Sequence, residues 1–168
     1  MGKRENQVTT YIMVFTVSSF IGWLYETIIT SIRWGTFAER GFLNSPICPI
    51  YGFGALLLLC LLRRFHSSVV IFLASTVVTT VVELVASYLL EIFLHKQLWT
   101  YKHWPLHFQG RISFFSSVLF GAFGVLLMKL VYPLVKVWVS KLEKRSGFFL
   151  SLWIVTLLGC DFWLCLMK

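Results

Sequence analysis

Carboxylates occur in this sequence where few other charges are found. Glu26 stands within the apolar run IGWLYETII, and Glu83 and Glu91 stand within a second apolar stretch. Arg40 and Arg111 each follow one of these stretches along the chain. A charged side chain in an apolar environment needs a partner, and arginine can hold a carboxylate with two hydrogen bonds. These residue types predict a polar cluster that pairs charges internally or binds a charged solute.

The elements that must position these residues are membrane helices. The chain has 168 residues, of which 58% are hydrophobic and 13% are charged, whereas a soluble domain carries about 25% charged residues. Because about 20 apolar residues cross a bilayer, the sequence predicts an all-α, polytopic transmembrane helix bundle of about five spans in a single domain. The spans are expected at residues 9–32, 47–62, 67–94, 112–135 and 148–167.

The second expected span is short and follows an unusual segment, RGFLNSPICPIYGFG, at residues 40–54. Pro46 and Pro49 push the residues before them away from the helical conformation, and the glycines allow close backbone approach. Non-helical backbone at membrane depth must be surrounded by protein or by a wet cavity. The segment is therefore a candidate re-entrant loop that lines the pocket. The alternative is an ordinary structured connector.

The distribution of basic residues predicts the orientation of the chain in the membrane. With five spans, nine of the 15 Lys and Arg residues lie on the side of the amino terminus and six on the other side. Cytoplasmic loops carry the excess of Lys and Arg, so we expect the amino terminus in the cytoplasm and the carboxyl terminus outside. The net charge of +8 then reflects loops that meet anionic lipid headgroups, and we expect the lipid bilayer, not nucleic acid, as partner.

Helical spacing places several polar residues on common faces. One face of the third span carries Thr76, Thr80, Glu83, Ser87 and Glu91, at intervals of three or four residues. The first span has a similar face, formed by Thr16, Ser19, Trp23, Glu26 and Thr30. The fourth span has a ridge of small residues that lets another helix approach closely, formed by Ser113, Ser117 and Gly121. Glu26, Glu83 and Asp161 all lie roughly 20–24 Å from the inner face, at about 1.5 Å per residue.

We therefore expect an outward-facing pocket built from Glu26, Arg40, Glu83, Glu91 and Arg111. Its rim would carry Trp23, Tyr51, Trp99 and Tyr101, with Trp104, His103 and His107 nearby. The alternative is a closed ion-pair network that pins the loops onto the bundle. Metal binding by the two histidines is not expected, because the proline between them argues against a helix that would place them on one face.

Motifs for catalysis are not found in these residues. The sequence lacks G-x-S-x-G and H-E-x-x-H, the patterns of a serine nucleophile and of a zinc site. We expect no catalytic residues, no metal and no cofactor, and do not expect an enzyme. The sequence also lacks the G-x-x-x-x-G-K-[ST] loop that cradles nucleotide phosphates.

Several motifs together resemble one family. The sequences GWLYE (22–26), RGFLNSPICPIYGFG (40–54), the span with two glutamates, W-x-Y (99–101) and GRI (110–112) are similar to the CmpB family, described as a putative ABC-transporter type IV. The resemblance covers residues 18–133. It departs at Thr100 and Lys102, where the family tends to have Asp and Ser, and at Gln109, where it tends to have Asn. These departures make the outer loop more basic, which indicates a more anionic substrate or a changed function.

The resemblance implies a transporter or ABC-type permease subunit for a solute, in the plasma membrane of a bacterial cell. In that case the glutamates would bind or relay charge, and the arginines would orient the solute or gate the pocket. A separate ATPase subunit and a homodimer are then expected, because the chain has no nucleotide-binding motif and five spans are few for a translocation path. The alternative is an accessory protein without transport activity that binds another membrane protein or lipid.

Overall fold

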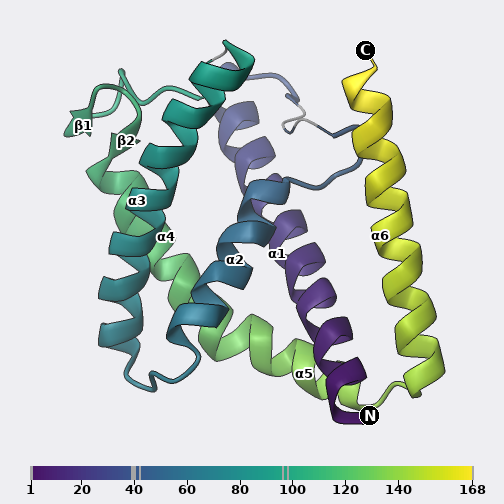
Figure 1. The fold of residues 1–168 in the computed structure, drawn as a ribbon. Coiled ribbons are helices and arrows are strands. Elements are labelled where there is room, and N and C mark those ends of the chain that lie inside the picture. The colour runs from purple at the N-terminus through teal and green to yellow at the C-terminus, as the bar shows by residue number, and fades with distance from the viewer. Residues whose placement is uncertain (1, 39–40, 42, 96, 98, 168) are drawn as a thin grey trace. The chain divides into compact units, whose positions relative to one another are not determined.

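The computed structural model describes the chain apart from residues 1, 39–40, 42, 96, 98 and 168. The described residues form helices and one very short strand pair (Figure 1), which confirms the predicted all-α membrane fold. The helices are α1 (Gly2–Trp34), α2 (Pro49–Leu62), α3 (Ser68–Leu94), α4 (Phe114–Leu126), α5 (Tyr132–Ser140) and α6 (Lys144–Leu166), and the strands are β1 (His107–Phe108) and β2 (Ile112–Ser113).

Helices α4 and α5 are two parts of one continuous helix. A π-helical turn, η1 (Leu127–Val131), joins them, and Pro133 lies in the first turn of α5. Proline lacks an N–H group and its ring collides with the carbonyl four residues earlier. A wider π turn just before it accommodates that local break in the hydrogen-bond ladder. The helix therefore continues to Ser140, beyond the predicted end of the fourth span at residue 135.

In the described part of the chain, four helices are long and apolar enough to cross a membrane. They comprise Gln7–Trp34, Ser68–Phe93, Phe114–Ser140 and Lys144–Cys165, and they correspond to the first, third, fourth and fifth predicted spans. Helix α2 has 14 residues, or about 21 Å of helix, against a hydrocarbon core of about 30 Å. The predicted second span is therefore a helix that is too short to cross alone.

The first compact unit consists of Met1–Leu56 and Val131–Lys168 and is built around α1. Both α5 and α6 pack against α1, and Val14 of α1 is fully buried. Ser151 Oγ of α6 lies 3.2 Å from Thr9 Oγ1 of α1 and hydrogen-bonds to it. The start of α6 is therefore held beside the start of α1, as the ribbon shows (Figure 1). We call this the α1–α6 unit.

The second compact unit, Leu57–Leu130, is built on the packing of α3 against α4, and we call it the α3–α4 unit. A Cβ atom on Gly121 of α4 would lie 2.1 Å from Thr76 Oγ1 of α3, so only glycine allows this approach. Thr80 Oγ1 of α3 donates a hydrogen bond of 2.7 Å to Ser117 Oγ of α4. The small-residue ridge of the fourth span therefore does allow another helix to approach closely, and that helix is α3 with its polar face.

The chain before α2 lies against the middle of α1. Cys48 N donates to the main-chain oxygen of Ser19 across 3.0 Å. Ser19 precedes the end of α1 at Trp34 by about 22 Å of helix, so the chain has returned along α1 before α2 begins. A Cβ atom on Gly52 would lie 2.3 Å from Ser19 Oγ, which shows how closely the two segments pack. The segment is therefore packed along α1, which both the predicted re-entrant loop and the alternative structured connector allow, so re-entry into the membrane stays a prediction.

Candidate functional site

The hairpin of β1 and β2 presents Arg111 to α3. The strands are antiparallel, with Phe108 opposite Ile112, and the turn between them contains Gly110 with φ +69°. Glycine adopts this left-handed conformation without steric cost. A Cβ atom on Gly110 would also lie 2.6 Å from Lys102 Cγ, so a side chain here would require the lysine to shift. Gly110 therefore shapes the turn that positions Arg111, the residue that follows it.

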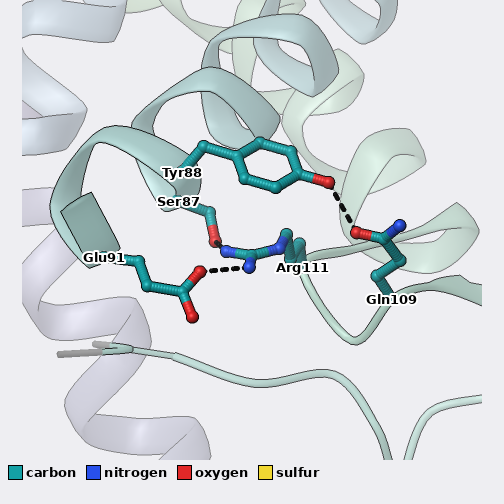
Figure 2. A network of polar contacts seen from close by, with 5 residues as sticks. All are labelled: Ser87, Tyr88, Glu91, Gln109 and Arg111. Carbon is teal, nitrogen blue, oxygen red and sulfur yellow. Dashed lines mark hydrogen bonds and ion pairs between the residues drawn. The ribbon is translucent and has the colours of Figure 1, made fainter. Parts of the chain in front are cut away.

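The guanidinium group of Arg111 is held by α3 on several sides (Figure 2). Its Nη1 donates to Ser87 Oγ across 2.9 Å, and its Nη2 forms an ion pair with Glu91 Oε2. Its Cζ lies 4.1 Å from the centre of the Tyr88 ring, within the range of a cation–π interaction. Trp99 Nε1 donates to the main-chain oxygen of Arg111 across 3.1 Å. Backbone and side chain of this arginine are therefore both fixed.

Two tyrosine hydroxyl groups complete the cluster. Tyr101 OH donates to Glu83 Oε1 across 2.6 Å, and Glu83 is 8% exposed. Tyr88 OH donates to Gln109 Oε1 across 2.5 Å, a contact that Figure 2 shows at the edge of the cluster. Gln109, one of the departures from the family pattern, therefore connects the hairpin turn to α3.

The two side chains of the Arg111–Glu91 ion pair differ in exposure. The side chain of Arg111 is 13% exposed, and that of Glu91 is 51% exposed. Solvent and salt screen an exposed charge far more than a buried one. The cation is therefore fixed and largely enclosed, whereas its counter-ion faces outward from the cluster.

The α1–α6 unit contains a second carboxylate–tyrosine pair. Tyr51 OH donates to Glu26 Oε1 across 3.0 Å. A Cβ atom on Gly22 would lie 2.1 Å from Tyr51 Cγ, so the glycine one turn before Glu26 makes space for the tyrosine ring. Trp23 lies nearby, stacked against Phe20 with ring centres 6.0 Å apart. The return of the chain along α1 thus brings Tyr51 to the polar face of that helix.

Asp161 of α6 binds the segment before α2. Its Oδ1 accepts from Asn44 N across 3.3 Å and from Asn44 Nδ2 across 2.8 Å. Its Oδ2 accepts from Ser45 N across 2.9 Å and from Ser45 Oγ across 2.6 Å. Sequence reasoning placed Asp161 at the depth of the glutamates but missed Asn44 and Ser45. The sequence feature that could have identified them is a pair of adjacent polar residues in a non-helical segment, because the donors of such residues need an acceptor.

The structure brings together part of the predicted pocket. Arg111 lies with Glu91, and Tyr101 lies with Glu83, all in the α3–α4 unit. Glu26 belongs to the α1–α6 unit, and Arg40 lies outside the described residues. A pocket shared by all five charged residues therefore stays a prediction.

The predicted rim residues also divide between the units. Trp99 and Tyr101 contact the Arg111 cluster, and Trp104 packs edge-on against Tyr101 with ring centres 5.8 Å apart. His107 Nδ1 accepts from Gly110 N across 3.1 Å, and His103 packs against Trp104. Trp23 and Tyr51 belong to the α1–α6 unit. Among the residues that the structure describes, no group of three or more His, Cys, Asp or Glu is placed to hold a metal ion.

Long apolar helices with polar side chains paired between them define an α-helical integral membrane protein. The chain belongs to the family described as "Putative ABC-transporter type IV", whose model, named for CmpB, matches residues 13–166. The family indicated by the sequence motifs is therefore confirmed, over a longer range than those motifs covered. No curated protein and no solved structure matched the chain.

Proposed function

We propose that this protein is the membrane subunit of a transport system that moves a solute across the plasma membrane. The observation that carries the proposal is membership of a transporter-type family over residues 13–166. Four helices of spanning length support it. In this proposal the amino terminus is cytoplasmic and the carboxyl terminus is outside, because that orientation keeps most Lys and Arg residues inside.

The solute site in this proposal lies at the polar clusters. Arg111 would orient the solute, and Glu83 and Glu91 would bind or relay charge. Support comes from their placement, because a charged group within or beside a membrane helix is usually functional and these three come from one face of α3 and from the hairpin.

The energy for transport would come from a separate ATPase subunit. The 168 residues contain no G-x-x-x-x-G-K-[ST] loop, which is the element that cradles nucleotide phosphates in P-loop ATPases. The chain itself would then catalyse no reaction. A homodimer would supply the larger number of helices that a translocation path needs.

The alternative function is that of an accessory protein that binds another membrane protein or lipid without transport. One observation favours it: Arg111 already has Ser87, Glu91 and the Tyr88 ring as partners. A network satisfied in this way can serve to hold the hairpin on α3. The two functions differ in whether an ATPase accompanies the chain.

Purification from the native membrane in a gentle detergent tests the proposal. A carboxyl-terminally tagged chain would be isolated and its partners identified and quantified by mass spectrometry. We expect an ATPase in fixed ratio, and ATP hydrolysis that is retained when the complex is placed in lipid discs. The matched control is the same chain carrying Gly121→Leu, which would break the packing of α3 on α4 because Gly121 leaves no room for a side chain.

Recovery of the native chain with an ATPase that the control variant loses would support a transport subunit. Recovery of the folded chain alone, or with a membrane protein that is not an ATPase, would contradict ATP-driven transport and favour the accessory function. Equal ATPase recovery with both variants would mean that the association does not depend on the folded bundle, and would also contradict the proposal.

A further inference from the structure

The Arg111 ion pair combines a fixed cation with an outward-facing counter-ion. Ser87, which binds Nη1 of Arg111, is 4% exposed. The Tyr88 ring covers one face of the guanidinium group, and Tyr88 is itself tied to Gln109. The hydrogen bond from Trp99 to the Arg111 carbonyl holds the backbone. None of these four contacts involves a group of opposite charge, so they position the cation without neutralising it.

Glu91 is the neutralising group, and it is held less firmly. Among the described residues, it is the carboxylate that pairs with Arg111. About half of its side chain is exposed, and the pair joins it through one guanidinium nitrogen, as Figure 2 shows. Exposed ion pairs contribute little to stability, because solvent and salt screen them. A carboxylate or phosphate group from outside can therefore compete with Glu91 for the same guanidinium group.

The charges around the cluster favour an incoming anion. The loop that carries the hairpin contains Lys102, His103 and His107, which are all exposed. Glu83, the other described carboxylate on this face of α3, is buried and accepts a hydrogen bond from Tyr101. Lys102 adds a positive charge to the loop that carries Arg111, and arginine binds oxyanions in a planar, two-bond geometry.

We propose that Arg111 is an oxyanion site in which the carboxylate or phosphate group of a soluble solute displaces Glu91. Glu91 acts as the resident counter-ion that occupies the site when solute is absent. This inference rests on the proposed function, because it names the class of solute as anionic. It does not depend on the ATPase, since anion binding can be measured on the chain alone.

Anion binding to the purified chain tests the inference. Acetate and inorganic phosphate would be titrated by calorimetry into the protein in phosphatidylcholine discs. We expect Glu91→Gln to bind at least one of the two probes about fivefold more tightly, because it removes a competitor whose pairing is of the order measured for exposed ion pairs. We expect Arg111→Lys to bind at least about tenfold more weakly, since lysine lacks the planar fork. Glu143→Gln is the matched control, because it changes the net charge equally at an exposed position distant in sequence.

Several outcomes would overturn the inference. Unchanged or weaker binding by folded Glu91→Gln would show that Glu91 does not compete with anions. Equal tightening in Glu143→Gln would show a general effect of net charge. Circular dichroism would establish folding, and Glu91→Ala, which also removes the carboxylate, would replace Glu91→Gln if that variant did not fold. Loss of binding in discs that contain phosphatidylglycerol would overturn the solute assignment in favour of lipid phosphate.

The test separates this inference from the proposed function. Tight, Glu91-dependent anion binding without any ATPase partner would keep the oxyanion site and reject ATP-driven transport. An ATPase partner without such binding would keep the transport subunit and reject the oxyanion site.

Discussion

Two non-helical segments of this protein are held to helices with opposite arrangements of charge. In the α3–α4 unit, the hairpin supplies a cation, Arg111, to a carboxylate on α3. In the α1–α6 unit, α6 supplies a carboxylate, Asp161, to neutral donors of Asn44 and Ser45. Both arrangements satisfy polar groups that apolar surroundings would otherwise leave unpaired.

The difference lies in how easily each carboxylate can be replaced. Asp161 accepts four hydrogen bonds from two neighbouring residues, and removing it would leave all four donors without that acceptor. Glu91 makes a single ion pair and is 51% exposed. The arrangement around Asp161 is therefore suited to holding a segment in place, and the arrangement around Glu91 is suited to exchanging one anion for another.

Replacing Asp161 should have the largest effect on local structure, because it removes all four hydrogen bonds that hold Asn44 and Ser45 to α6. We expect Asp161→Ala to raise the labelling rate of Cys48 by a water-soluble maleimide on the order of tenfold, since hydrogen bonds to a charged group contribute about 1.5–3 kcal/mol. The measurement would use a chain whose other cysteines, Cys60, Cys160 and Cys165, are serine. Glu91→Ala in that background is the control, and equal labelling of both variants would show that Asp161 does not hold the segment.

The two carboxylate–tyrosine pairs should differ in strength. Tyr101→Phe removes the donor to Glu83, which is 8% exposed, and we expect a loss of about 1–3 kcal/mol of unfolding free energy. Tyr51→Phe removes the donor to Glu26, which is only partly buried, and we expect a smaller loss. Unfolding in mixed micelles with increasing dodecyl sulfate would measure both. A larger loss for Tyr51→Phe would reverse this ranking of the two units.

Neutralising Glu83 should lower stability more than neutralising Glu143, an exposed acid directly before α6. Glu83→Gln keeps an acceptor for Tyr101 but loses the charge, and we expect a loss of about 1 kcal/mol. Glu143→Gln changes an exposed side chain and should stay within about 0.5 kcal/mol of the native protein. The same micelle titration compares them. Equal and negligible effects would contradict a functional or structural role for Glu83.

Salt should change the stability contributed by Glu91 slightly more than the stability contributed by Asp161. The half-exposed Arg111–Glu91 pair is screened at high ionic strength, so Glu91→Gln should lose less stability in 1 M than in 0.1 M sodium chloride, with both losses below about 1 kcal/mol. The effect of Asp161→Asn should depend less on salt, because its partners are neutral. Identical salt dependence for the two variants would argue against this account of the comparison.

Much of the fold follows from patterns that are local in sequence. Runs of apolar residues predicted the four helices of spanning length that the described residues form, whereas the Pro and Gly residues of 40–54 indicated only a non-helical segment and not its return along α1. The polar face of α3 was predicted from its three- and four-residue spacing, because a helix places such residues on one side. Helix α2, Pro49–Leu62, nearly coincides with the predicted 47–62, and its shortness was already evident in the sequence.

The site was predicted less completely, because its partners are far apart in sequence. Arg111 could pair with any of several acids, and only packing selected Glu91, with Ser87 and Tyr88 beside it. Asn44 and Ser45 lie more than 100 residues before Asp161, and no local pattern relates them.

Apolar composition, helical periodicity and short motifs are properties of neighbouring residues, so they were enough to predict a helical membrane protein of one family. Which carboxylate each donor meets, and which carboxylate is exposed, follow instead from packing between residues that are distant in sequence. Those choices depend on the close approach of helices at Gly22, Gly52 and Gly121, where a side chain would separate the elements that carry the partners.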